Sequence, residues 1–173
     1  MRSKWADDER VRAILVALTP INRLACEVSR AHGLRIGDVL ALKTNDVRKG
    51  RFTIHEEKTG KARRISLTKT EQATLLGVAG RVYVFEHRTD WKRHRTRNAV
   101  YKDVVRAARA FRLEGFTPHS LRKAYAVEKL AEYGGDTDKV RKLLNHSNEA
   151  VTMIYTLADM ISPVTFMRRK KAN

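Results

Sequence analysis

The stretch LLNHSNEAVTMIYT (residues 143–156) places one histidine, His146, nine positions before one tyrosine, Tyr155. Two interpretations are open for this pair. In the first, both are ordinary residues of two ordinary helices. In the second, the tyrosine attacks a phosphate group and the histidine helps to hold it. The remaining sequence has to decide between the two.

The net charge of the chain favours a polyanionic partner. Its 173 residues include 36 lysines and arginines against 19 acidic residues, which gives a formal charge of +17. A chain of this length suits one folded domain. Nucleic acid fits the positive excess best, and an acidic membrane surface comes second. Because a ribosomal-type RNA-binding protein would share this composition, the charge alone indicates no mechanism.

The cysteine content and the spread of the acidic residues limit the cofactors to be expected. Cys26 is the only cysteine, which excludes an internal disulfide and a zinc site built from cysteines. No carboxylate cluster suggests a bound metal, so we expect no metal and no other cofactor. The start MRSKWADDER is polar, and no apolar run approaches about 18 residues. We therefore expect a cytoplasmic protein.

The spacing of apolar residues predicts an α+β fold that is mainly helical with a small antiparallel β-sheet. Periodicity and capping residues predict helices over these ranges: 7–18, 20–32, 36–42, 68–78, 97–113, 119–133, 136–145 and 148–158. Strands are predicted over 51–56 and 62–67, joined by the turn KTGK, and over 81–85. The basic segment 86–98 is expected to form a loop, either solvated or in contact with DNA.

The segment HSLRKAYA (119–126) is the first candidate for an anion site. His119 and Arg122 are three residues apart, so they lie on one face of a helix. They follow Pro118, near a helix N-terminus, which favours anions. A histidine and an arginine presented together in such a place suit a phosphate group. The alternative is a surface histidine beside a solvated arginine.

Two further segments contribute candidate residues. In GLRIGDVLALK (33–43), Asp38 can hold the guanidinium of Arg35 through a bidentate pair, although a plain surface ion pair is the alternative. Lys58 lies at the tip of the predicted hairpin, where a lysine is normally solvated but can also reach into a DNA groove. The same turn is not an ATP-binding phosphate loop, because His55 stands where that motif requires glycine.

In combination and order, these positions resemble the catalytic signature of the tyrosine recombinase family, also called phage-type integrases. The resemblance rests on the stretches GLRIGDVLAL, KTGKARRISL, TPHSLRKAYA and LLNHSNEAVTMIYT, which span residues 33–156. The step of nine residues from the histidine to the tyrosine is among the more constant spacings of that family. The resemblance implies the fold of the family's catalytic domain and these catalytic residues: Arg35, Lys58, His119, Arg122, His146 and Tyr155.

The resemblance also implies how a DNA phosphodiester is broken without a metal. Tyr155 attacks the phosphorus and forms a 3′-phosphotyrosyl bond, which conserves the bond energy for religation. Arg35 and Arg122 clamp the non-bridging oxygens, where transition-state charge collects. His146 donates a further hydrogen bond to the phosphate. His119 accepts the tyrosine proton or orients the tyrosine.

The same resemblance implies supporting roles and partners. Lys58 protonates the departing 5′-oxygen, and Asp38 orients the nearby arginine. The implied partner is double-stranded DNA, on which the chain forms a homo-oligomer, a tetramer, while it is a monomer or weakly associated without DNA. No membrane partner is expected, and the resemblance implies a protein that is associated with a prokaryotic nucleoid or encoded by a virus or plasmid. The residues expected to contact DNA are basic and lie near the catalytic positions: Lys61, Arg63, Arg64 and Lys123.

The chain departs from the family pattern in two positions and in its length. Asn145 stands where the family often has glycine, and Lys123 stands where it often has histidine or arginine. We expect a catalytic domain over 1–160 and a tail over 161–173, which either docks on a neighbouring protomer or is a frayed basic end. We expect no N-terminal core-binding domain of the kind that the family carries, because Arg35 is only 34 residues from the start. We therefore expect a catalytic fragment of a longer protein in preference to a reduced member.

Two other functions stay open. A type IB topoisomerase-like nicking and closing enzyme shares the chemistry, but His146, the short chain and the KTGK hairpin favour the integrase. A non-catalytic basic nucleic-acid-binding module is the second alternative, and it predicts that replacing Tyr155 by phenylalanine changes nothing. The filling of every expected catalytic position argues against that module.

Overall fold

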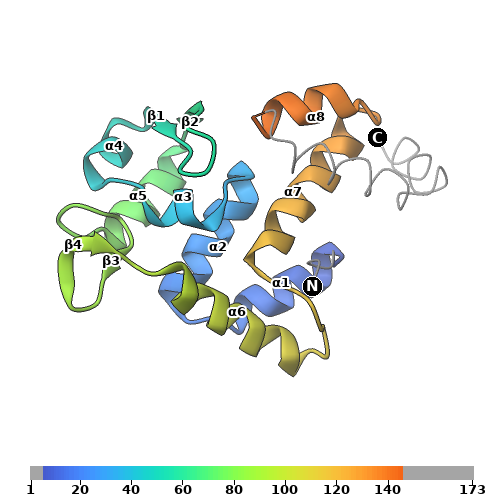
Figure 1. Cartoon of the computed structure of the whole chain (residues 1–173), viewed down its shortest axis with the longest axis horizontal. Helices are drawn as coiled ribbons and strands as arrows, with labels where there is room; N and C mark the ends of the chain where they lie inside the picture. The colour runs from blue at the N-terminus through green and yellow to red at the C-terminus, as the bar shows by residue number, and fades with distance from the viewer. Residues whose placement is uncertain (1–5, 146–173) are drawn as a thin grey trace.

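The computed structural model describes residues 6–145 of the 173-residue chain. Its elements are α1 (Asp8–Val16), α2 (Pro20–His32), α3 (Ile36–Leu40), α4 (Thr44–Lys49), β1 (Arg51–His55), β2 (Ala62–Ser66), α5 (Lys69–Val78), β3 (Glu86–His87), β4 (Asp90–His94), α6 (Arg97–Ala110), α7 (Pro118–Glu132) and α8 (Thr137–Leu143). Figure 1 shows helices around a central α2, with two separate antiparallel hairpins, β1–β2 and β3–β4. The predicted class, mainly helical α+β with little antiparallel sheet, is confirmed.

Helix α2 has the bounds predicted from the sequence and positions two candidate segments. Pro20 is its first residue, and Gly33 ends it in the left-handed conformation with φ of 60°. A Cβ at Gly33 would lie 2.4 Å from Cδ1 of Tyr125, so only glycine permits α7 to pack this closely on the end of α2. The result is that α7 lies beside the segment that leads into α3.

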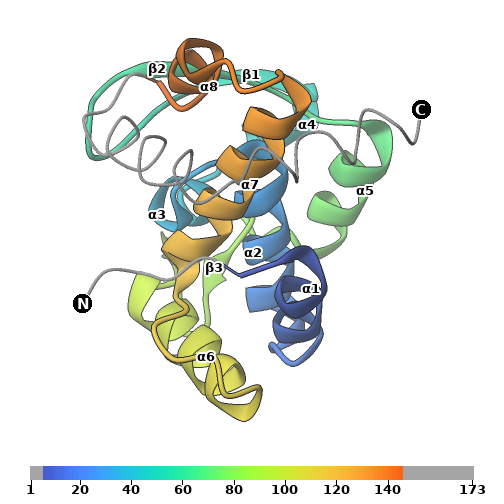
Figure 2. The same cartoon turned by 90° about the vertical axis from the view of Figure 1, so that its right-hand side faces the viewer.

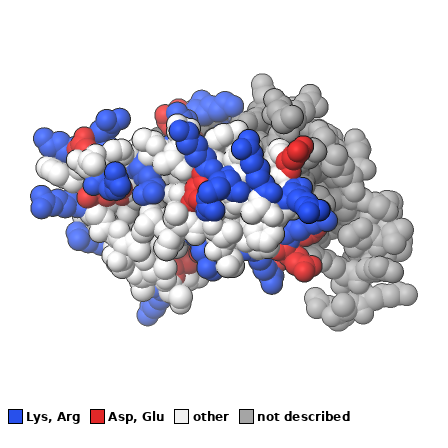
Figure 3. Space-filling view, turned by 90° about the horizontal axis from the view of Figure 1, so that it is seen from below, with Lys and Arg blue, Asp and Glu red and all other residues white. Residues whose placement is uncertain are grey.

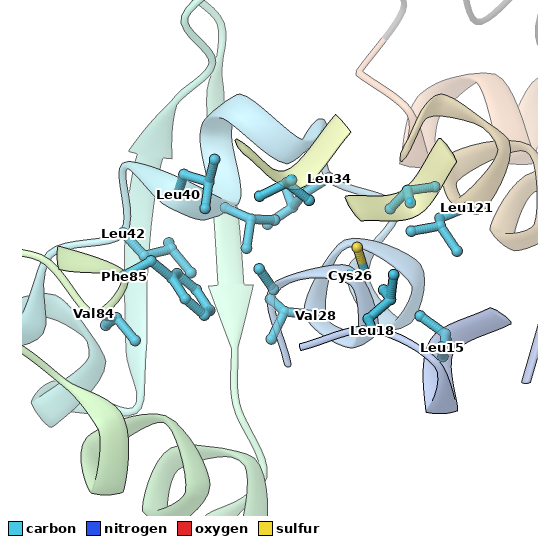
Figure 4. Packing of buried hydrophobic residues seen from close by; sticks show 14 of the residues in the cluster. Leu15, Leu18, Cys26, Val28, Leu34, Leu40, Leu42, Val84, Phe85 and Leu121 are labelled. Atoms are coloured by element: carbon cyan, nitrogen blue, oxygen red, sulfur yellow. The ribbon is translucent and has the colours of Figure 1, made fainter. Parts of the chain in front are cut away.

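The core forms where these helices meet the chain between α5 and β3. Figure 4 shows side chains of one buried cluster that come from α2, α3, α7 and this connecting segment, among them Leu40, Phe85 and Leu121. Cys26 belongs to the same cluster and is fully buried. Burial raises the pKa of its thiol to about 12, so the thiol stays protonated and unreactive. Within residues 6–145, no helix is both long and apolar enough to cross a membrane.

The β1–β2 hairpin follows the predicted pattern of alternating burial. Its register runs from Arg51 opposite Ser66 to His55 opposite Ala62. Phe52 and Ile65 are directly paired and buried, whereas their neighbours along each strand are more exposed. The two strands are therefore fixed in register by their core-facing side chains, and the six-residue turn between them is held in one place.

The predicted strand over 81–85 is wrong. Val84 and Phe85 are both buried, so adjacent side chains of this segment do not alternate between core and solvent as they would in a half-buried strand. Tyr83 makes an isolated bridge with Lys43 and no longer ladder. The apolar residues of this segment fill the core as a connecting chain.

The basic segment 86–98, expected as a loop, contains the β3–β4 hairpin and the start of α6. Glu86 pairs with His94, and His87 pairs with Asp90, with an irregularity between the two pairs. The strand DWKRH has no alternating apolar residues, which is why its sequence does not indicate a strand. Helix α4 was also not predicted, because its sequence TNDVRK is short and polar.

The last described helices pack as a smaller unit. The Asp136 side chain caps α8 by accepting a hydrogen bond from the backbone N–H of Lys139 at 2.9 Å, as predicted for this helix start. Val140 and Leu144 are buried against Leu130 of α7. Figure 2 shows α8 beside the β1–β2 hairpin. The helix predicted over 148–158 lies outside the described residues.

Candidate active site

A cleft of about 320 Å³ brings together four of the predicted catalytic side chains. Arg35 comes from the start of α3, Lys58 from the β1–β2 turn, and His119 and Arg122 from the first turns of α7. Arg97, the first residue of α6, also lines the cleft. The N-termini of the long helices α6 and α7 thus both reach the same cleft, and a helix N-terminus attracts anions.

The guanidinium of Arg35 is held by a buried carboxylate. Its Nη1 donates to Oε2 of Glu56 at 2.7 Å, and Glu56 is only 1% exposed. The hydroxyl of Thr59 donates to the same oxygen at 3.0 Å, and Nη1 of Arg63 lies 3.5 Å from Oε1. A charged pair at this distance and depth fixes the arginine in direction as well as in position.

The ionisation of Glu56 results from two opposing effects. Burial raises its pKa, because the charged carboxylate is taken out of water. Hydrogen bonds from Arg35 and Thr59, with the charges of Arg35 and Arg122, outweigh burial and leave the pKa below its usual value. Glu56 is therefore a carboxylate at neutral pH. Sequence reasoning missed this residue, and its only signal was an acidic side chain two positions before Lys58.

Asp38 joins α3 to the β1–β2 turn. Its Oδ1 accepts a hydrogen bond from the backbone N–H of Glu57 at 2.9 Å, and the residue is buried. Burial raises the pKa of Asp38, the hydrogen bond from Glu57 lowers it, and the net shift is upward. Arg35 also pairs with Glu56 of the same turn. The role of Asp38 in orienting that arginine stays a prediction.

Arg122 is 2% exposed and connects α7 to the end of α8. Its Nη2 donates to the carbonyl oxygen of Leu144 at 3.0 Å. The next residue, Asn145, has φ of 65°, in the left-handed region that glycine and asparagine adopt most readily. This conformation explains why asparagine serves at a position where glycine was the expected residue. His146 and Tyr155 lie outside the described residues.

The β1–β2 turn also contacts this end of α8. Nζ of Lys61 donates to the carbonyl oxygen of Asn145 at 3.3 Å, and Nδ2 of Asn145 donates to the carbonyl oxygen of Ala62 at 3.4 Å. The turn that carries Lys58 is thus fastened to the residue directly before His146. These contacts hold Asn145, the last described residue, against the β1–β2 hairpin.

The residues predicted to contact DNA have different surroundings. Arg63 donates from Nη1 to the carbonyl oxygen of Gly33 at 3.3 Å and from Nη2 to that of His32, so it caps the end of α2. Arg64 is exposed on the outer side of β2, and Lys123 is half-buried on α7. DNA contact by Lys61, Arg63, Arg64 and Lys123 stays a prediction. Within residues 6–145, no group of three side chains is arranged to hold a metal.

Comparison with known proteins gives the family. The model of the phage integrase family matches residues 4–160. The chain belongs to this family. Tyrosine recombinase XerA of Pyrococcus horikoshii is 30% identical over 158 residues, covering 87% of this chain and 55% of that protein. Tyrosine recombinase XerD of Rhizobium meliloti is 29% identical over 140 residues, covering 75% of this chain and 45% of that protein.

Solved structures of phage integrase family members share the fold. A lambda integrase tetramer bound to a Holliday junction matches with a TM-score of 0.71 and 21% identity, over 88% of this chain and 48% of that one. The lambda integrase catalytic core matches with a TM-score of 0.66 and 23% identity, over 85% of this chain and 93% of that one. At this identity the likeness shows the fold alone. The chain spans about half the length of the two curated relatives named above.

Proposed function

We propose that the chain is the catalytic domain of a site-specific DNA recombinase that cleaves and rejoins DNA through Tyr155. One observation carries the proposal: the cleft gathers Arg35, Lys58, His119 and Arg122 from three separate segments. Membership in the phage integrase family supports the assignment of these residues to DNA strand cleavage. Such a reaction conserves the phosphodiester bond energy in a covalent intermediate.

Arg35 and Arg122 are suited to stabilise the reacting phosphate in the transition state. Arg35 is fixed by Glu56, and Arg122 is fixed through the Leu144 carbonyl. Because both are pre-oriented, they stabilise developing charge on the non-bridging oxygens without reorganising during the reaction. The N-termini of α6 and α7 add partial positive charge to the same place.

Proton transfers complete the proposed step. Oη of Tyr155 forms a bond to phosphorus while the bond from phosphorus to the 5′-oxygen breaks. The phenolic proton passes to His119, and Lys58 supplies a proton to the departing 5′-oxygen. His146 donates a hydrogen bond to a non-bridging oxygen. Religation is the reverse of this step with a new 5′-hydroxyl, so it needs no nucleotide cofactor and no metal.

The proposed partner is duplex DNA, and the proposed assembly on it is a tetramer. Solved relatives with this fold include a lambda integrase dimer bound to a core site and a tetramer bound to a Holliday junction. The face seen in Figure 3 carries more Lys and Arg than acidic side chains, which suits a polyanion. The expected division into a domain over 1–160 and a docking tail over 161–173 belongs to this proposal.

A covalent-trapping assay tests the proposal. The protein is mixed at low salt with nicked suicide duplexes that cover the DNA flanking its own gene, and the products are separated on a denaturing gel. We expect a protein–DNA adduct that disappears in Tyr155→Phe. If duplexes are bound but neither protein gives an adduct, the non-catalytic module replaces the recombinase. Relaxation of supercoiled DNA without any site requirement would favour the topoisomerase-like enzyme.

A further inference from the structure

The β3–β4 hairpin presents an aromatic ring that is flanked by two cations. Trp91 on β4 is 43% exposed. The guanidinium carbon of Arg81 lies 5.6 Å from the ring centroid, and Nζ of Lys92 lies 5.4 Å from it. Both distances allow cation–π attraction, which restricts the two long side chains. Figure 1 shows this hairpin at the edge of the molecule, away from α7 and α8.

The surface of this hairpin is strongly basic. The exposed cationic residues of the hairpin and of the segments on either side of it are Arg81, Arg88, Lys92, Arg93 and Arg97. The two acidic residues within 86–97 are turned to local backbone groups. Oε2 of Glu86 accepts from the N–H of Arg81 at 2.7 Å, and Oδ1 of Asp90 accepts from the N–H of Lys92 at 3.0 Å. The hairpin therefore offers cations to a partner while its carboxylates are engaged internally.

The base of the hairpin is anchored in the core of the molecule. The N–H of Arg95 donates to the carbonyl oxygen of Phe85 at 2.6 Å, and its Nε donates to Oδ1 of Asn22 at 2.7 Å. Nδ2 of Asn22 in turn donates to Oδ2 of Asp103 on α6 at 2.7 Å. These hydrogen bonds fix the base of the hairpin relative to α2 and α6, and therefore fix the direction in which the hairpin projects.

The hairpin is close in the sequence to a residue that lines the cleft. Arg97 lines the cleft and follows Trp91 by six residues. At about 3.3 Å per extended residue, the chain between them spans at most about 20 Å. This length corresponds to about six base pairs at 3.4 Å per step along one strand. Trp91 therefore lies no farther than about six base-pair steps from the residue that lines the cleft, a separation that one bound duplex can cover.

We infer that the β3–β4 hairpin is a second DNA-contacting element, which binds the phosphate backbone of the duplex beside the cleft. The inference rests on the proposed function, since it takes the polyanion in the cleft to be DNA. Arg81 and Lys92, held on the Trp91 ring, and the neighbouring Arg88 and Arg93 bind backbone phosphates. Because the ring already restricts two of these side chains, they lose less conformational entropy on binding. Contacts of this kind position the duplex and do not read its sequence.

Binding measurements in the Tyr155→Phe background test the inference apart from catalysis. Fluorescence anisotropy gives Kd over a series of salt concentrations for a long duplex and for one truncated on the hairpin side. In Lys92→Gln/Arg93→Gln we expect the slope of log Kd against log salt to fall by about two, at about 0.9 per phosphate contact. We also expect the several-fold preference for the long duplex to disappear.

A matched double variant controls for the loss of charge. Lys102→Gln/Arg109→Gln removes the same charge from exposed positions of α6. It should keep the preference for the long duplex. The inference is overturned if the hairpin variant keeps the parent slope and preference, or if the control loses both equally. Adduct formation by the unaltered chain tests the proposed function separately, so the two failures are distinguishable.

Discussion

The two hairpins of this molecule place cations in different ways. In β1–β2, the turn that carries Lys58 begins at Glu56. The buried carboxylate of Glu56 accepts hydrogen bonds from Arg35 and from Thr59 of the same turn. In β3–β4, Lys92 lies over the exposed ring of Trp91, and the anchor is at the base of the hairpin. A cation that must meet one reacting atom needs a buried partner, whereas a cation that meets any phosphate of a backbone needs only an exposed platform.

The largest expected effect is on the rate of DNA cleavage, when Lys58 of the first hairpin is replaced. We predict that Lys58→Ala slows adduct formation about 10²- to 10⁴-fold, the usual contribution of a general acid. A substrate with sulfur at the bridging 5′ position should restore the rate, because a thiol has a pKa of about 8.5 and departs without added proton. Single-turnover adduct formation measures both effects.

Glu56→Gln in the same assay distinguishes the role of Lys58 as general acid from the role of Arg35 in binding the phosphate. Its defect acts through Arg35, so the sulfur substrate should not restore its rate. Equal rescue of Glu56→Gln and Lys58→Ala would mean that Glu56 acts by placing the lysine. Absence of rescue in Lys58→Ala would remove the lysine from the role of acid.

The second expected effect is on stability and contrasts two adjacent glutamates. We predict that Glu56→Ala lowers the free energy of unfolding by about 3–5 kcal/mol, because Arg35 and Arg63 lose a buried partner. Glu57→Ala should cost less than about 1 kcal/mol. The Glu57 side chain is 65% exposed, and its pair with Arg97 at 3.6 Å is equally exposed. Urea unfolding of both variants checks this, and equal losses would contradict the assigned anchor.

The sequence predicts those parts of the fold that depend on local signals. Pro20 and Gly33 delimit α2, and Phe52 and Ile65 alternate with polar residues along β1 and β2. These signals are read within a few residues, so the helix and the hairpin match the prediction. The gathering of four cleft residues agrees with a signature that is read from their order along the chain.

The features that were missed depend on distant contacts. Glu56, which directly follows β1, is buried where Arg35, 21 positions away in the sequence, donates a hydrogen bond to its carboxylate. Val84 and Phe85 are both buried because the chain before β3 passes through the core, which local alternation does not show. The entry of Arg97 into the cleft likewise requires knowing where α6 begins in space.

The third effect concerns the anchor of the second hairpin at low pH. Asp103 is buried, which raises its pKa, but hydrogen bonds from Asn22, Arg106 and Thr19 outweigh burial and lower it to about 2 from 3.8. This stabilisation is present above the unfolded pKa and is lost as the pH falls through the folded pKa. It amounts to about 2 kcal/mol at 1.36 kcal/mol per unit.

Urea unfolding between pH 5 and about pH 2 measures this loss against Asp103→Asn. The variant cannot titrate at this position, so its stability should fall less over the window from about pH 4 to about pH 2. Other carboxylates titrate in both proteins and cancel in the difference. Parallel curves would show that Asp103 does not carry the acid sensitivity.

The smallest expected effect is on stability when the platform of the second hairpin is removed. We predict that Trp91→Ala changes the free energy of unfolding by less than about 0.5 kcal/mol, as is usual for exposed positions away from the core. The ring contacts two side chains that are themselves exposed, so little buried area depends on it. Urea unfolding measures this. A loss of about 2 kcal/mol or more would show that the ring supports the fold, and that the two hairpins are anchored more alike than their exposures indicate.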